Sequence, residues 1–198
     1  MIRKYVSGVS GNYVIDPDGT RGLAAFTVYC DMSDKNGVGV TVISHDSESR
    51  THVNGLEPAG SYSSDIHYTG TSFSQLAGLT NVSSHCEQFI EYECHYTYLL
   101  ERGSGGRGWW VSRNSTKMTY CGEGSPGSGK CACGMTNVCV NPKYGCNCDA
   151  IERAWREDSG LLNDKTHLPV KQLRFGDTGG DDEGGYHTLG KLKCYGIA

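Results

Sequence analysis

The chain has 198 residues with 18 Lys and Arg against 22 Asp and Glu, a net charge of −4, and a hydrophobic content of 37%. This length suits one domain, the absence of a basic stripe argues against a nucleic-acid binder, and no apolar run approaches the ~18 residues that a membrane span needs. Residues 1–8 lack a hydrophobic signal core, so we expect the chain to be cut from a longer or mature protein.

Three strands are predicted near the N-terminus. Residues 11–15 form the first and end at a turn in which Pro17 fixes φ and Gly19 supplies a positive φ. Residues 25–32 are rich in β-branched and aromatic side chains and form the second. The Asn-Gly signal at 36–37 then predicts a hairpin into residues 38–43.

Residues 45–70 are polar and irregular, and a short helix is predicted over residues 72–79. Ser72 is its expected N-cap and Gln75 the partner in a capping box. The residues that share its apolar face are Phe73, Leu76 and Leu79.

A long strand is predicted over residues 85–100. From Ile90 onward, apolar side chains recur at every second position, which indicates one buried face. The positions expected on that face are Ile90, Tyr92, Cys94, Tyr96 and Tyr98.

Another strand is predicted over residues 108–113, followed by a cysteine-rich loop. Residues 149–159 are predicted to form the best helix, with Asn147 or Asp149 as its cap and Gly160 as its C-terminal glycine. Residues 168–175 and 189–194 are the last expected strands, on either side of an acidic loop at 177–183. The elements together predict an α+β fold of short antiparallel strands, two short helices and long loops.

Ten cysteines in a glycine-rich chain indicate disulfides and an oxidising compartment. The close pairs are C-x-C at 131/133 and 146/148, which is too tight for a zinc knuckle and disfavours pairing within each motif. We therefore expect disulfides rather than zinc at the whole set of cysteines: Cys30, Cys86, Cys94, Cys121, Cys131, Cys133, Cys139, Cys146, Cys148 and Cys194.

Two sequons, at Asn81 and Asn114, predict N-glycosylation of a secreted chain. Two acidic loops offer the oxygens that calcium prefers, but neither has EF-hand spacing, so we favour a solvated turn for each and keep calcium as the alternative. The acidic residues in question are Asp16, Asp18, Asp177, Asp181 and Asp182. No pattern of a catalytic nucleophile or of paired histidines occurs, so we expect no enzyme and no cofactor other than calcium.

Several motifs resemble the fibrinogen-like domain of the contactin-associated, neurexin-related proteins, which is related to the C-propeptide domain of fibrillar collagens. The opening sequences 12–19 and 26–32 are similar to both groups. The more specific motifs are Ser84-His85-Cys86-Glu87-Gln88, Trp109-Trp110-Val111-Ser112-Arg113, Lys130-Cys131-Ala132-Cys133-Gly134, Cys146-Asn147-Cys148-Asp149-Ala150 and His167-Leu168-Pro169-Val170. The resemblance implies a single disulfide-rich fibrinogen-like domain over residues 11–198, preceded by an extension at 1–10.

The resemblance also implies particular pairings and ligands. By analogy with the collagen domain, Cys94 would pair with Cys194, and calcium would bind at Asp16 and Asp18. The last acidic calcium ligand of that domain falls at Ala24 here, and Arg21 adds a positive charge, which argues against calcium at this loop. Members of the family carry an upstream cysteine that this chain lacks; we expect Cys121 to restore the even count by pairing with Cys30.

The resemblance implies a non-enzymatic extracellular module, secreted or part of an ectodomain, that mediates cell-surface adhesion or recognition. Its partners would be other extracellular proteins or glycans, contacted by the loops at 44–70 and 177–185. One alternative is a structural assembly domain of the extracellular matrix that trimerises or forms filaments. A further alternative is a calcium-dependent lectin that uses the acidic loop. An upstream Gly-X-Y tract would favour the assembly domain.

Overall fold

The computed structural model describes residues 8–19, 22–35, 37–101 and 105–196. Its central element is the long strand β6 (His85–His95), which pairs on both edges. β9 (Trp155–Leu162) runs along one edge, while β11 (Gly184–Leu189) and β12 (Leu192–Tyr195) follow one another along the other. All of these pairings are antiparallel.

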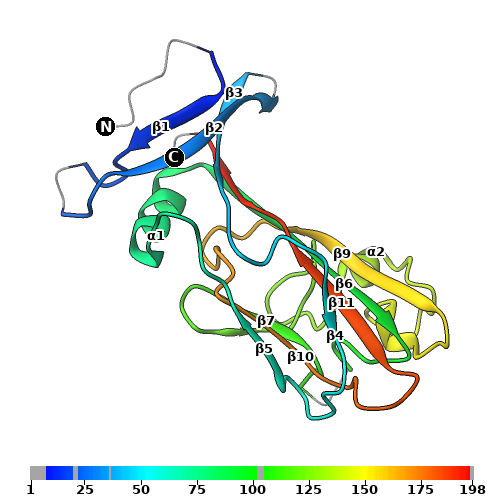
Figure 1. Ribbon diagram of the computed structural model, residues 1–198. Helices are drawn as coiled ribbons and strands as arrows, with labels where there is room; N and C mark the ends of the chain where they lie inside the picture. The colour runs from blue at the N-terminus through cyan, green and yellow to red at the C-terminus, as the bar shows by residue number, and fades with distance from the viewer. Residues whose placement is uncertain (1–7, 20–21, 36, 102–104, 197–198) are drawn as a thin grey trace.

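The larger sheet has eight strands and extends from β6 in two directions, as Figure 1 shows. Beyond β12 lie three further strands: β3 (Val38–Ile43), β2 (Phe26–Lys35) and β1 (Gly11–Ile15). Beyond β11 lies β4 (Thr51–Val53). β6 therefore carries one wing of the sheet at its start and the other at its end.

A smaller sheet of four strands packs against the inner face of the β4–β11–β6–β9 wing. In sheet order its strands are β5 (Tyr62–Asp65), β10 (Gln172–Phe175), β7 (Trp109–Val111) and β8 (Lys117–Met118). Phe175 of β10 stacks on Tyr92 of β6 with ring centroids 4.3 Å apart. Gly185 leaves room for this contact, because a Cβ there would come within 2.4 Å of the Tyr92 hydroxyl. The fully buried side chains of Trp110, Leu173 and Leu189 complete a close-packed core.

The helices are few and short. α1 (Phe73–Val82) begins with the predicted capping box: the Gln75 N–H donates to Ser72 Oγ, and the Ser72 N–H donates to Gln75 Oε1. α2 (Ala132–Thr136) and a 3-10 turn (Cys148–Ala150) lie in the cysteine-rich segment. The described chain is thus mostly antiparallel sheet, with less helix than the α+β prediction implied. Within the described residues, no helix is long and apolar enough to cross a membrane.

The strands predicted at 11–15 and 38–43 are confirmed, and the strand predicted over 85–100 is confirmed for residues 85–95 only. The predicted alternation on β6 holds from Ile90 to Cys94 and then fails. Tyr96 has a φ of 55° and ends the strand, so Tyr96 and Tyr98 are only half-buried while Thr97 is buried instead. The segment 45–70, expected to be irregular, contributes the short strands β4 and β5.

The helix predicted over 149–159 is wrong. Ile151 takes a left-handed φ of 49°, which ends the 3-10 turn, and the chain continues as strand β9. Eight residues of β9 pair with Gln88–His95, so sheet hydrogen bonding outweighs the local helical spacing. Gly160, expected after the helix, lies inside the strand and packs its backbone against Gly122.

Four disulfides connect the described chain. The bonded pairs are Cys86–Cys194, Cys94–Cys148, Cys131–Cys146 and Cys133–Cys139. Neither C-x-C motif closes on itself. The pairing implied for Cys94 and Cys194 is wrong because Cys194 lies directly opposite Cys86 on β6, with Cα atoms 4.1 Å apart. Cys94 lies eight residues further along the strand, a distance of roughly 26 Å at the usual rise.

The expected Cys30–Cys121 bond is also absent, and both thiols are free and buried. Cys30 lies in β2, opposite Thr41 of β3. Thr41 in turn lies opposite Cys194 of β12, in the wing formed by β1, β2, β3 and β12. Cys121 Sγ lies 3.5 Å from the Asp158 carbonyl oxygen in β9. The two cysteines therefore belong to different ends of the sheet, well beyond the ~7 Å between Cα atoms that a disulfide allows.

Candidate recognition surface

The outer face of the β4–β11–β6–β9 wing carries a row of aromatic side chains. The strand register places Trp155 of β9 opposite His95 of β6, and Tyr186 of β11 opposite His52 of β4. Successive residues of a strand point to opposite faces, so these four share the face that does not contact the core. We call Trp155, His95, Tyr186 and His52 the aromatic face.

The rings of the aromatic face touch in sequence. His52 stacks on Tyr186 at 4.7 Å between centroids, Tyr186 lies 5.5 Å from Trp155, and Trp155 lies 5.4 Å from His95. Trp155 is 52% exposed, which is unusual for so large an apolar side chain. Exposed aromatic residues grouped in this way are typical of protein interaction sites.

Arg50 joins this face from the segment just before β4. Its guanidinium lies 3.3 Å from the ring centroid of Tyr186 and makes a bidentate ion pair with Glu93, at 2.6 Å for Nε–Oε1 and 2.9 Å for Nη2–Oε2. The ion pair raises the pKa of Arg50 further and lowers that of Glu93. Arg50 therefore fixes the position of Tyr186 while half of its side chain stays exposed.

Negative charge gathers beside Trp155. Glu93 and Glu157 lie directly opposite each other on β6 and β9, and Glu91 lies two residues along β6 from Glu93. Burial raises the pKa of Glu91, and the charges of Glu157 and Glu93 raise it further. Like charges opposite each other destabilise a sheet. Only Glu93 among the three has a cation paired with it in the described residues.

A groove of about 400 Å³ opens beside the edge strand β9. Its walls include Trp155, Glu93 and Glu157 on one side and Val138 and Val140 of the cysteine-rich segment on the other. Val138 is 71% exposed and Val140 is 46% exposed. The groove thus combines exposed apolar side chains with two carboxylates and with Arg156, whose guanidinium pairs with Glu152. It continues the aromatic face around the edge of the sheet.

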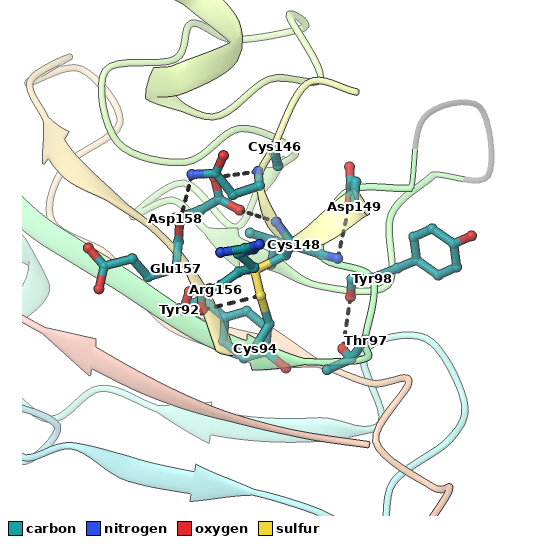
Figure 2. The surroundings of a disulfide bond; sticks show 12 residues. Tyr92, Cys94, Thr97, Tyr98, Cys146, Cys148, Asp149, Arg156, Glu157 and Asp158 are labelled. Carbon is teal, nitrogen blue, oxygen red and sulfur yellow. Dashed lines mark hydrogen bonds between the residues drawn. A yellow bond between two sulfur atoms is a disulfide. The ribbon is translucent and has the colours of Figure 1, made fainter. Parts of the chain in front are cut away.

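The disulfide Cys94–Cys148 braces this edge, as Figure 2 shows. It ties the inner side of β6 to the 3-10 turn (Cys148–Ala150), directly below the strand pair that carries His95 and Trp155. Glu157 points away from the disulfide in Figure 2, whereas the neighbouring Asp158 points toward the backbone next to Cys148. The alternation of β9 therefore gives one carboxylate to the surface and one to the interior.

Asp158 holds the C-x-C turn against β9. Its Oδ1 accepts the Asn147 N–H and its Oδ2 accepts the Cys148 N–H, each at 2.9 Å. Burial nevertheless raises the pKa of Asp158 to about 7. Asp149 acts similarly on the other side, where Oδ1 accepts the N–H groups of Leu99 and Leu100, and burial raises its pKa as well.

The acidic loop 177–183 sends its carboxylates to separate partners. Buried Asp177 accepts the Tyr98 N–H at 2.7 Å, and Asp182 pairs with Arg153 at 2.6 Å. Glu183 accepts the Gly180 N–H. Because these oxygens do not converge, the residues of this loop do not fit a calcium site at Asp177, Asp181 and Asp182.

The loop at Asp16 and Asp18 is different. Oδ1 of each residue is buried and accepts no hydrogen bond from a described residue, whereas Asp18 Oδ2 accepts the Leu23 N–H. Carboxylate oxygens of this kind are ligands that calcium prefers. Among the described residues, three metal-ligating side chains come together only at Cys131, Cys146 and Asp158, and the two cysteines are bonded to each other.

Both predicted glycosylation sites lie at the surface. Asn81 is exposed in α1, and Asn114 is exposed between β7 and β8. Arg113 approaches Asn81 Oδ1 at 3.5 Å, so the two sequons share one side of the molecule.

Sequence reasoning missed the aromatic face. The expected contacts were the loops at 44–70 and 177–185, whereas Trp155, His95 and Tyr186 lie on strands. The alternation of His95 with buried residues was the available signal, but Trp155 had been placed on a helix. The loop predicted at 44–70 does contribute, through Arg50 and His52.

Comparisons with known proteins point to one group. No family model matches the chain. It is 40% identical over 188 residues to contactin-associated protein 1 of Mus musculus and to that of Homo sapiens, which covers 94% of this chain and 13% of those proteins. It is 36% identical over 192 residues to neurexin-4 of Drosophila melanogaster, covering 93% of this chain and 15% of that protein. The chain therefore corresponds, along nearly all of its length, to one segment of contactin-associated and neurexin-type proteins.

Proposed function

We propose that the chain is an extracellular recognition module, without enzymatic activity, whose aromatic face contacts a protein partner in cell adhesion. The observation that carries the proposal is the exposed Trp155, which lines a groove together with the apolar Val138 and Val140. Trp, Tyr and Arg are the residues most enriched at binding hot spots, and all three occur together here. The similarity to adhesion proteins and the four disulfides support an ectodomain location.

The shape of the surface supports a protein rather than a small molecule. The aromatic face lies across an open sheet, and the groove beside it is broad and bounded by β9, an edge strand of the sheet. Small-molecule sites are usually enclosed clefts. A partner that covered the aromatic face and inserted a basic side chain beside Glu157 would complement both its shape and its charge.

Contactin is the first partner to test, since the mouse relative is named for its association with contactin. The test is surface plasmon resonance of the purified chain against an immobilised contactin ectodomain, with a Trp155→Ala variant. We expect Trp155→Ala to weaken binding at least about ten-fold, the loss typical of a hot-spot aromatic. Tyr29→Ala is the matched control, because Tyr29 is 45% exposed on β2, in the other wing.

Two results would count against the proposal. Equal affinity of the Trp155→Ala variant and the unaltered chain would remove the aromatic face from the contact. A loss of the same size in Tyr29→Ala would indicate a non-specific effect of truncating an exposed ring.

Calcium at Asp16 and Asp18 is a second proposal, supported by their buried Oδ1 atoms, which accept no hydrogen bond from a described residue. The ion would have a structural role, neutralising two carboxylates at the end of β1. Calcium should raise the unfolding temperature of the chain and have no effect on an Asp16→Asn, Asp18→Asn double variant. Equal unfolding temperatures with calcium and with a chelator would refute it.

A further inference from the structure

The smaller sheet carries a second groove, distinct from the aromatic face. It has a volume of about 530 Å³ and lies on the outer side of β7, β8 and β10. The opposite side of this sheet contains the buried core residues Trp110, Leu173 and Phe175. The side chains that matter for the groove's chemistry are Trp109, Ser115, Lys117, Lys171, Gln172 and Arg174.

Three cations line this groove, and no carboxylate does. Lys117, Lys171 and Arg174 form no ion pair with any described residue, unlike Arg50 and Lys193 elsewhere. The chain as a whole carries a net charge of −4, so the positive charge of this groove is opposite in sign to the net charge of the chain. Asp65 lies on the edge strand β5 and does not line the groove. Its carboxylate accepts a hydrogen bond from the lining residue Gln172.

Neutral groups hold the three cations in place. Lys117 Nζ lies 3.7 Å from the ring centroid of Trp109. Lys171 Nζ donates to Ser115 Oγ at 2.9 Å, and Arg174 Nη1 donates to the Gly60 carbonyl at 3.1 Å.

None of these contacts neutralises a charge. Burial lowers the pKa of Lys117, with no charged partner to offset it. Each cation keeps further N–H donors, including Arg174 Nη2, for which the structure gives no partner among the described residues.

We propose that this groove binds a sulfated glycosaminoglycan. Three positioned cations match the spaced sulfates of such a chain, since charge-assisted hydrogen bonds from Lys and Arg are the strongest contacts to anionic oxygens. Gln172 and Ser115 add neutral hydrogen-bonding groups suited to sugar hydroxyls. The inference is independent of the protein-binding role of the aromatic face, because the two sites lie on different sheets.

The position of the groove favours a glycan over an acidic peptide. Extended peptides commonly bind by adding a strand to a sheet edge, where main-chain groups are free. This groove lies mainly over β7 and β10, the two inner strands of the sheet, which already pair on both sides. The edge strand β8 contributes only Lys117 to its lining. Recognition there depends on side chains, and the side chains offered are cations and hydrogen-bonding groups.

The experiment measures binding of the chain to immobilised heparin by surface plasmon resonance at ~0.15 M salt. Protein treated with N-glycosidase is used, since Ser115 belongs to the sequon at Asn114. Desulfated heparin tests the need for sulfate, and polyglutamate tests an acidic polypeptide as the occupant. The variants are the double variant Lys171→Gln, Arg174→Gln and the charge-preserving Arg174→Lys.

We expect binding to heparin that falls steeply with salt and does not need calcium. The double variant should lose at least about ten-fold in affinity because two cation–sulfate contacts disappear, whereas Arg174→Lys should retain most of it. Lys143→Gln is the matched control: Lys143 is an exposed lysine of the cysteine-rich segment that forms no ion pair among described residues. Contactin binding should be unchanged in the double variant.

Three outcomes would overturn the proposal. The first is an absence of binding to heparin at this salt concentration. The second is a Lys143→Gln variant that weakens binding as much as the double variant, because this would show a non-specific charge effect. The third is polyglutamate binding as tight as heparin binding, which would make an acidic polypeptide the occupant. Loss of contactin binding in Trp155→Ala, with heparin binding intact, would separate this site from the aromatic face.

Discussion

The rings of Trp155 and Tyr186 lie 5.5 Å apart although their strands, β9 and β11, are separated by the whole width of β6. Strands two positions apart are separated by about 9.6 Å, so the two side chains lean toward each other over β6. This contact makes one surface out of three strands. The position of this surface depends on the disulfides, on the β9 strand and on the charges beside Trp155. These features give the predictions that follow.

Peptide mapping of the unreduced protein should recover four cross-linked pairs. They are Cys86–Cys194, Cys94–Cys148, Cys131–Cys146 and Cys133–Cys139. Cys30 and Cys121 should react with iodoacetamide only after unfolding, because both are buried and burial raises the pKa of each thiol. A peptide that linked Cys94 to Cys194, or Cys30 to Cys121, would contradict the framework described above.

Removal of the Cys94–Cys148 bond should destabilise the fold and the aromatic face together. The bond spans a sequence separation of 54, so a Cys94→Ala, Cys148→Ala variant should lose roughly 3–4 kcal/mol of unfolding free energy in denaturant titrations. Cys86→Ala, Cys194→Ala is the matched control, because this bond lies in the other wing and spans a separation of 108, with an expected loss of about 4–5 kcal/mol. Contactin binding should weaken in the first variant only. Equal weakening in both variants would show that the Cys94–Cys148 bond has no specific role in holding the aromatic face.

Glu157→Gln should make the protein more stable and a poorer binder. Neutralising one member of the Glu93–Glu157 cross-strand pair relieves repulsion worth about 0.2–1 kcal/mol, measurable as a higher unfolding temperature. The same change removes the charge that we expect a basic partner residue to meet. Glu123→Gln, an exposed glutamate outside the sheet, should change neither quantity. Tighter binding by the Glu157→Gln variant would show that the partner is not basic at this point.

The buried Asp158 should make stability depend on pH. Its pKa is raised to about 7, so between about pH 4 and 7 the folded chain holds a proton that the unfolded chain has released. Its stabilising contribution is therefore full below about pH 4 and is lost as pH rises through about 7. His187, whose pKa is lowered by burial to about 4, acts in the opposite direction over part of this range.

A variant isolates the effect of Asp158 from that of His187. The unfolding free energy of the unaltered chain minus that of Asp158→Asn should fall by more than about 1 kcal/mol between pH 4.5 and 7.5, as a shifted carboxyl pKa requires. Denaturant titrations of both proteins at the two pH values give this difference. A difference that stayed constant with pH would mean that Asp158 titrates at its ordinary pKa.

The sequence predicted those elements whose signals are local. The capping box of Ser72 and Gln75, the strands at 11–15 and 38–43, and the alternation from Ile90 to Cys94 all depend on nearby residues. β9 could not be found in this way, because helical spacing around Trp155 is overruled by eight pairings with a strand 60 to 74 residues earlier.

The predicted disulfide pairings were wrong for a related reason. The partner of Cys194 is set by the register between β6 and β12, which cysteine spacing does not encode. The aromatic face depends on the same long-range register, because His95 and Trp155 meet only once β6 and β9 are paired.

The most direct test of the central claim is hydroxyl-radical footprinting of the chain, alone and bound to contactin, with oxidation quantified by mass spectrometry. Trp155 is exposed in the free chain and Tyr186 is partly exposed, so both should oxidise readily there and be protected in the complex. Tyr29, exposed in the other wing, should oxidise equally in both states. Protection of Tyr29 without protection of Trp155 would contradict the account and place the contact on β1 and β2.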